Sequence, residues 1–377
     1  MIRRLSAPLL SLVLLIAGSG LLNTFVAVRL EIENVSIQTI GMISSTLYLG
    51  MLLGSLWIGR WISRVGHIRS FIVFAALSAF VVLAQAIWID PLYWGFLRLI
   101  CGLCSAGIFI VIESWFLLQS PSSERSSALS LYLVVFYAAL TGGQFLFNLT
   151  NPKSAAPFCI TALLFALSIL PILNKKISEP KIERSTHLGL PRIFRISPLG
   201  FMGGLASGML LAIIYTLIPI YAKEIGLQTS EIGTLMGVII FGGLSFQWPL
   251  GKLADKTGRR RILNTASFMT MALAIAIPQA GESSFALLSL GWLFGGFSFT
   301  IYPLSMTYIC EKVPEDQIIS VTGGFILAYG IGAIAGPLFA SMFMSFFGSS
   351  VLFYFIAAIS ICLCLFGLKN QKIIENK

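Results

Sequence analysis

Gly251-Lys-Leu-Ala-Asp255-Lys-Thr-Gly258-Arg259-Arg260-Arg261 is the stretch that decides the fold of this chain. A similar stretch occurs in the first half, Gly59-Arg-Trp-Ile-Ser63-Arg64-Val-Gly66-His-Ile-Arg69. In each copy, glycines and basic residues separate two apolar segments of membrane-spanning length, which predicts a tight turn between two helices. Two similar halves, each with a basic hairpin at the same place, are typical of a two-bundle membrane transporter.

The composition is that of a membrane protein. Hydrophobic residues make up 57% of the chain and charged residues 11%, whereas soluble domains carry roughly 25% charged residues. We therefore expect the lipid bilayer to surround most of the surface. The net charge is +10. The basic residues lie in short loops between apolar runs and not on one folded face, which argues against nucleic-acid binding.

Twelve apolar segments of about 18 to 24 residues are each long enough for a helix to cross the membrane. Their long apolar runs lack the polar alternation of a β-barrel. We therefore predict an all-α integral membrane fold with twelve helices in two pseudo-symmetric six-helix bundles. The predicted spans are 8–28, 38–58, 70–89, 92–116, 128–149, 156–173, 200–221, 233–251, 262–280, 285–308, 318–344 and 350–368.

The longest polar stretch of the sequence divides the chain into two halves. It predicts a bundle over residues 1–173, a cytoplasmic linker over 174–198 and a second bundle over 199–377. We interpret the linker as a solvated basic segment, and binding of regulators or anionic lipid is the alternative.

The distribution of Lys and Arg predicts the orientation. With the N-terminus inside, the cytoplasmic segments hold most of the basic residues, as the positive-inside rule requires. We expect both termini in the cytoplasm. The exceptions are Arg29, Arg98, Lys153 and Lys223.

Further motifs accompany the hairpins. Arg98-Leu-Ile-Cys-Gly102 lies in span four and Gly332-Ala-Ile-Ala-Gly336-Pro337 in span eleven. With the hairpins, they resemble the motifs of the major facilitator superfamily (MFS) over the whole chain. The closer resemblance is to the YcaD-like group of bacterial MFS proteins, through Leu22-Asn23-Thr24, Glu113-Ser114, Gln247-Trp248-Pro249-Leu250-Gly251, Tyr302-Pro303 and Cys310-Glu311-Lys312-Val313. The resemblance implies a secondary transporter in the inner membrane of a bacterium that works by alternating access, with its binding site between the halves.

The hairpins, by this resemblance, form a cytoplasmic gate. Asp255 is expected to pair with basic residues and with the N-terminal end of span eleven, as a latch that releases when the halves rock. A solvated turn that only enforces topology is the alternative. The expected gate residues are Gly59, Arg64, Gly66, Gly251, Asp255, Gly258, Arg259 and Arg260, with Gly332, Gly336 and Pro337 as gate-helix residues.

The glycines have two predicted roles. Gly251 is expected to let two helices approach closely, and Gly258 to supply the turn. Pairs at small-xxx-small spacing predict close helix packing, in spans two and eleven where the halves slide past each other. These pairs are Gly50 with Gly54, Gly204 with Gly208 and Gly332 with Gly336.

The first half departs from the family pattern. Ser63 stands where the pattern usually has an aspartate and His67 where it has an arginine. Span five carries Thr141-Gly142-Gly143-Gln144 without the expected proline. We therefore do not expect gate latches of equal strength in the two halves.

Span four carries two charged candidates. Arg98 either binds substrate or relays protons, or is a structural arginine bonded to carbonyls. Glu113 is the only carboxylate predicted inside a span, which favours proton coupling; an acid that fixes the helix end beside Ser114 or Arg125 is the alternative. The two candidates lie within about 60° around the helix but about 22 Å apart along it, too far for a direct pair.

Neutral polar groups complete the predicted pathway. Amide and aromatic groups in a midplane cavity orient small ligands, although any single group is more often a packing hydrogen bond. The candidates are Asn23, Gln144, Asn148, Tyr215 and Tyr302.

Motifs of other classes are missing from the sequence. It has no phosphate-binding Gly-rich loop and no metal-ligand cluster, so we expect neither a cofactor nor a metal. An integral membrane enzyme or a sensor is the rival class, but a single membrane glutamate and the lack of an output domain favour a transporter that is not an enzyme. The expected partners are a small-molecule substrate, protons and the lipid bilayer, with the protein as a monomer.

Two kinds of transport stay open. Asn23, Arg98 and Gln144 favour uptake of a small polar metabolite if they line the cavity. The aromatic-rich apolar spans favour efflux of amphipathic compounds.

Overall fold

The computed structural model describes residues 2–119, 125–173, 190–280, 283–314 and 317–375. Within them, only the backbone is described at 2–5, 117–119, 125–130, 319 and 370–375. The described residues form helices and no β-strand. Twelve of the helices are long and apolar enough to cross a membrane, which confirms the predicted spans.

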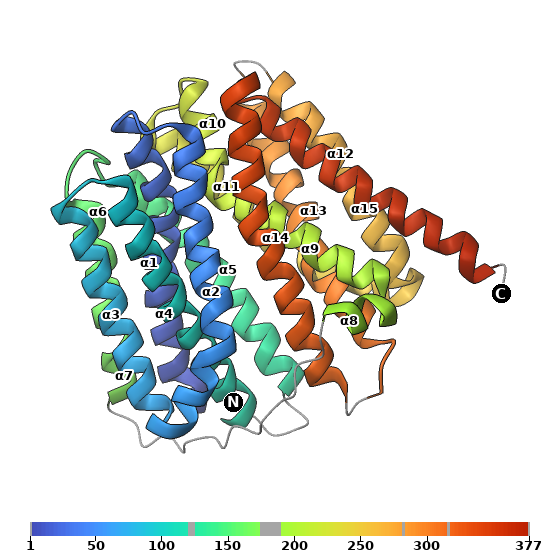
Figure 1. The fold of residues 1–377 in the computed structure, drawn as a ribbon, viewed down its shortest axis with the longest axis horizontal. Helices are drawn as coiled ribbons and strands as arrows, with labels where there is room; N and C mark the ends of the chain where they lie inside the picture. The colour runs from blue at the N-terminus through green and yellow to red at the C-terminus, as the bar shows by residue number, and fades with distance from the viewer. Residues whose placement is uncertain (1, 120–124, 174–189, 281–282, 315–316, 376–377) are drawn as a thin grey trace. The chain divides into compact units, whose positions relative to one another are not determined.

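The chain divides into two compact units (Figure 1). The first comprises residues 1–183 with 226–237, and the second 184–225 with 238–377. Residues 174–189 of the predicted linker lie outside the described residues.

The first unit holds the helices α1 (Ile2–Ile32), α2 (Ile37–Val65), α3 (His67–Ile87), α4 (Pro91–Gln119), α5 (Arg125–Asn148), α6 (Ala156–Leu167) and α7 (Leu170–Leu173). The second holds α8 (Leu190–Ile196), α9 (Pro198–Thr216), α10 (Ile218–Glu224), most of α11 (Thr229–Thr257), α12 (Arg259–Ala276), the 3-10 turn η2 (Ile277–Gln279), α13 (Ser284–Cys310), α14 (Ile318–Phe347) and α15 (Val351–Glu375).

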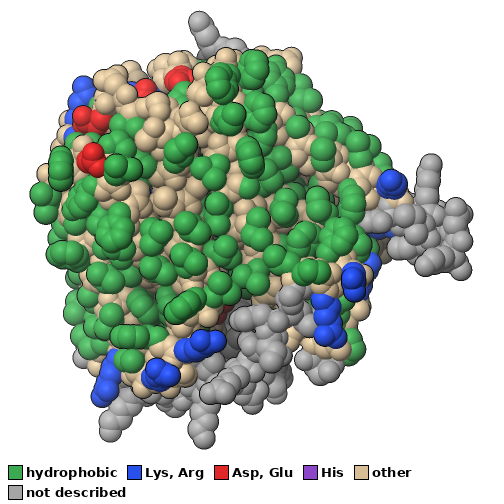
Figure 2. Space-filling model, viewed as in Figure 1, with side chains coloured by type: hydrophobic (Ala, Val, Ile, Leu, Met, Phe, Trp, Pro, Cys, Tyr) green, Lys and Arg blue, Asp and Glu red, His purple; other side chains and the backbone are tan. Residues whose placement is uncertain are grey.

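The surface follows from the apolar sequence of the spans. Hydrophobic side chains cover most of the face shown in Figure 2, and the described charged side chains lie near its edges. Exposed side chains such as Phe80, Leu92 and Phe285 suit a lipid environment, in which a helix satisfies its own backbone polar groups.

Glycines bring two helix pairs of the first unit into backbone contact. A methyl group at Gly50 of α2 would press on the carbonyl oxygen of Leu99 in α4, and one at Gly102 of α4 on that of Leu47. A methyl group at Gly20 of α1 would lie 2.7 Å from the carbonyl oxygen of Leu140 in α5. The backbones of α2 and α4, and those of α1 and α5, therefore lie in close contact, with no large side chain between them.

The second unit repeats this arrangement. A methyl group at Gly208 of α9 would press on the carbonyl oxygen of Tyr329 in α14. One at Gly242 of α11 would press on that of Trp292 in α13. In each half, the first span therefore packs on the fifth and the second on the fourth, which is the pseudo-symmetry that the sequence predicted.

The expectation that the glycines of spans two and eleven sit where the halves slide was wrong. Gly50 packs against α4, and Gly332 and Gly336 pack against Leu205 and Met209 of α9. These glycines hold helices together within one unit.

The two hairpins turn at single glycines. α2 ends at Val65 and α11 at Thr257, and the next residues, Gly66 and Gly258, have φ of 92° and 98°. L-residues with a side chain avoid this region, so each turn requires glycine.

The remaining hairpin glycines lie inside helices, which shortens the predicted turns. A methyl group at Gly59 or Gly251 would meet no atom of the described structure within 4 Å. Within its own unit, Gly251 therefore makes no close approach to another helix among the described residues.

Two predicted spans are broken near prolines. Span six is α6 followed by α7, with Pro171 just after the break, and span seven is α9 followed by α10, with Pro219 in the first turn of α10. Proline has no N–H to donate to the preceding turn, so each break falls where one helical hydrogen bond cannot form.

Part of the predicted linker is a helix. In α8, Ile193 is fully buried in a cluster with Ile309, Val321 and Phe325. The prediction of a solvated linker was therefore wrong at Ile193, whereas Arg192 and Arg195 of the same helix are exposed.

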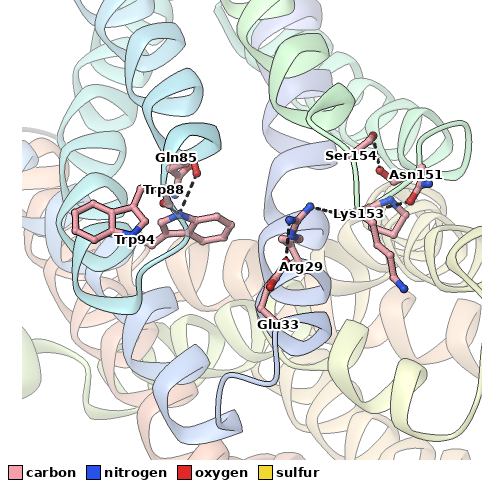
Figure 3. Close-up of polar contacts among 9 residues, drawn as sticks. Arg29, Glu33, Gln85, Trp88, Trp94, Asn151, Lys153 and Ser154 are labelled. Atoms are coloured by element: carbon pink, nitrogen blue, oxygen red, sulfur yellow. Dashed lines mark hydrogen bonds and ion pairs between the residues drawn. The ribbon is translucent and has the colours of Figure 1, made fainter.

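Side chains tie the helix ends of the first unit together (Figure 3). The Arg29 guanidinium at the end of α1 donates to the Pro152 carbonyl oxygen at 3.0 Å and pairs with Glu33 at 2.8 Å. The Trp94 indole N–H donates to the carbonyl oxygens of Gln85, at 3.1 Å, and Trp88, at 2.9 Å. These bonds fasten α1 to the α5–α6 loop and α4 to the end of α3.

Candidate functional site

The structure brings two predicted site residues together in the first unit. The Arg98 side chain of α4 is 2% exposed. One of its terminal nitrogens, Nη2, donates to the Asn23 Oδ1 of α1 at 2.9 Å. Its Nε atom is buried without a hydrogen-bond partner. Arg98 is thus bonded to a side-chain amide and not to the backbone carbonyls of the structural alternative.

The neighbouring residue of α1, Thr24, points about 100° further around that helix and contacts α5. Thr24 donates to the Gln144 Oε1 of α5 at 2.7 Å, and Gln144 Nε2 donates to the Gly20 carbonyl oxygen at 2.9 Å. Gln144 is buried, and these contacts are those of helix packing. Asn23 and Thr24 therefore link α1 to α4 and to α5, respectively.

Glu113 has a different environment. Glu113 is exposed at the surface of the protein. Its Oε1 accepts a hydrogen bond from the Tyr132 hydroxyl of α5 at 3.3 Å. Ser114 donates to the Ile110 carbonyl oxygen and not to Glu113. The alternative partner, the Arg125 side chain, lies outside the described part of the chain. Glu113 is therefore a carboxylate within a span whose described partner is one phenolic hydroxyl.

Asn148 lies at the end of α5. Its amide nitrogen donates to the Thr234 hydroxyl at 3.1 Å, and its Oδ1 is buried without a partner. This bond is a contact between helix ends, as expected of a packing amide.

The predicted tyrosines lie in the second unit among other aromatic rings. The Tyr215 ring of α9 meets Phe299 edge-on at 5.7 Å between centroids. The Tyr302 ring of α13 meets Phe325 at 5.4 Å and Tyr329 at 5.2 Å. Tyr215 and Tyr302 are both partly exposed.

A charge network follows the second hairpin. Arg259 pairs with Asp255 at 3.1 Å and with Glu311, just beyond α13, at 3.0 Å. Arg260 donates through Nε and Nη2 to the Gly367 carbonyl oxygen of α15. Asp255 is thus paired with a basic residue of its own hairpin, and Arg259 connects α11, α12 and the end of α13.

Two other expected gate residues are placed within their own helices. Arg64 is exposed in the last turn of α2. Pro337 lies inside α14, beside Gly336.

Among the partners that sequence reasoning missed are Thr24, Tyr132, Glu311 and Gly367. Thr24 and Glu311 lie within motifs that resemble the YcaD-like group, so the motifs themselves were the available signal. Tyr132 and Gly367 carry no local signal, because their roles depend on which helices pack together.

These observations define a polytopic helical membrane protein of the two-bundle transporter type. Residues 9–281 and 200–372 match the model of the Major Facilitator Superfamily. The chain belongs to this family and is a multi-pass membrane transporter.

Relatives and solved structures agree with this assignment. The chain is 32% identical to the MFS-type transporter YcaD of Escherichia fergusonii, over 97% of this chain and 95% of the relative. It is 31% identical to YcaD of Salmonella newport, over 96% and 94%. The crystal structure of the nucleoside transporter NupG has the same fold, with a TM-score of 0.81, 15% identity and coverage of 98% of this chain and 99% of NupG.

Proposed function

We propose that this chain is a secondary active transporter that moves a small molecule across the bacterial inner membrane by alternating access, coupled to protons through Glu113. Family membership supports the transporter class. The coupling is supported by one observation, the exposed Glu113 carboxylate within a span with the Tyr132 hydroxyl as its partner.

The position of Glu113 supports a proton-carrying role. A charge in lipid is costly, so ionisable residues inside spans usually face a water-filled space or the bundle interior. Among the described residues, no cation pairs with the Glu113 carboxylate. The Tyr132 hydroxyl can donate a hydrogen bond to this carboxylate whenever Glu113 is ionised. A carboxyl group that is not locked in an ion pair is free to gain and lose a proton during a cycle.

Orientation, gate and assembly belong to the same proposal. The positions of the basic residues support cytoplasmic termini and bundles over residues 1–173 and 199–377. The Asp255–Arg259–Glu311 network would then lie at the cytoplasmic end, where it would act as the latch. The protein would work as a monomer.

The test begins with a ligand. The detergent-purified chain is heated with a panel of metabolites and lipophilic drugs at about pH 6 and about pH 8, and a compound that raises the melting temperature is used in proteoliposomes. Stabilisation of about 2.7 kcal/mol is expected at one hundred times Kd. We expect a pH gradient to drive accumulation by the unaltered chain.

Glu113→Gln is the decisive variant. It should retain ligand binding and downhill exchange but lose the response to the pH gradient, because glutamine cannot release a proton. Tyr132→Phe is the matched variant that keeps the carboxylate and removes its partner, and it should respond to the gradient with an altered pH profile. If Glu113→Gln transports with the full response to the gradient, Glu113 does not couple protons.

A further inference from the structure

Arg98 is a buried cation without an acidic partner. Its side chain is 2% exposed, and the described residues supply one hydrogen-bond acceptor, the neutral Asn23 Oδ1. The guanidinium stays protonated in proteins. An isolated charge in a span is costly unless something offsets it.

The acids of α4 are too far away to offset this charge. Glu113 lies about 22 Å from Arg98 along the helix and Asp90 about 12 Å, at about 1.5 Å per residue. Asp90 also accepts from the backbone N–H of Tyr93 at 2.8 Å, which holds it at the start of α4. Among the described residues, no carboxylate forms an ion pair with Arg98.

Each of the two side chains keeps a hydrogen-bond donor that no described acceptor takes. The Arg98 Nε–H is buried without a partner. The Asn23 side chain is partly exposed, and no acceptor among the described residues takes its NH2 group. The guanidinium fork matches the geometry of a carboxylate or phosphate. Thr24, bonded to Gln144, holds this part of α1 in place.

We propose that Arg98 and Asn23 form a subsite for an anionic group, so that the transported molecule carries a carboxylate or a phosphate. The anion would supply the missing counter-charge. In a site closed to water, the attraction between opposite charges is strong, and a cationic compound is repelled. This inference rests on the proposed function and selects, between the two kinds of transport, small acidic metabolites over lipophilic cations.

The experiment compares acids with matched neutral compounds. The purified full-length chain is heated with pairs that differ mainly in charge: benzoate with benzamide, succinate with succinamide, and glycerol 3-phosphate with glycerol, together with the cation tetraphenylphosphonium. We expect at least one acid to raise the melting temperature when its neutral partner does not. Arg98→Gln should weaken binding of that acid about tenfold or more, since a hydrogen bond to a charged group is lost.

Two variants serve as controls. Arg69→Gln removes an exposed arginine at the start of α3 and should bind the acid as the unaltered chain does. If Arg98→Gln does not fold, Arg98→Lys decides, because a lysine ammonium keeps the charge but cannot form the two parallel bonds. It should bind the acid several-fold more weakly.

The proposal is overturned if no acid distinguishes the unaltered chain from Arg98→Gln, or if Arg98→Lys binds with unchanged affinity. Stabilisation by tetraphenylphosphonium and not by any acid would also overturn it. Transport of that cation by proteoliposomes would leave the transporter assignment standing. If the unaltered chain binds the acid but transports none of the compounds, the result counts against the proposed function and not against the subsite.

Discussion

The glycine contact between α1 and α5 makes Gly143→Ala a direct test of the packing. A methyl group at residue 143 would press on the carbonyl oxygen of Ala17 and lie 3.0 Å from the backbone nitrogen of Leu21. These are backbone atoms of α1, which cannot rotate away as a side chain can. The two helices must therefore separate.

The magnitude follows from the distances. Carbon atoms pack best at about 3.5–4.0 Å, so the helices must move apart by about 0.5–1 Å, which forfeits a quarter to a half of the contact energy along the seam. Overpacking of this kind costs about 1–3 kcal/mol. The Thr24–Gln144 bond, 2.7 Å long and one residue away, would be stretched as well.

Gly142 provides the matched control in the same helix. A methyl group there would meet no described atom within 4 Å. Alanine is better than glycine in a helix interior by about 0.5–1 kcal/mol, so Gly142→Ala should be as stable as the unaltered chain or slightly more stable.

The assay is the melting temperature of both variants in detergent, followed by size-exclusion chromatography after heating. Gly143→Ala should melt lower by about 1 °C for each kcal/mol lost, because the entropy of unfolding grows with chain length. If the two variants melt at the same temperature, the close α1–α5 contact does not contribute as argued.

Two further predictions concern the second hairpin. Gly258→Ala should destabilise the chain by about 1–3 kcal/mol because φ is 98° there, while Gly251→Ala, inside α11, should not; equal melting temperatures would remove the strain argument. Asp255→Asn should slow transport with little loss of expression, because Arg259 keeps Glu311 but loses one of its two acids; unchanged turnover would exclude the latch.

Most of the fold was predictable from the chain alone. A segment of about 20 apolar residues must form a helix in lipid, and its length identifies a span without knowledge of its neighbours. The breaks at Pro171 and Pro219 and the helix α8 were missed. A proline changes a span only locally, and seven residues of α8 are too few for a pattern.

The candidate site was predictable in part. Arg98 and Glu113 stand out because charges within apolar segments are rare. Their partners do not stand out. Asn23 and Tyr132 are ordinary polar residues on other helices, and they become partners because α1 and α5 pack beside α4.

The amino-acid sequence by itself determined the twelve spans, the repeated hairpin and the family, because these depend on local composition and on order along the chain. Only the tertiary structure decided which candidates act together. It joined Arg98 to Asn23, assigned Gln144 to packing and turned the glycines of spans two and eleven towards helices of their own half. The physical reason is that a contact between two helices depends on how each helix is rotated about its axis and how far it is shifted along it. Side chains that lie far apart in the sequence determine both together.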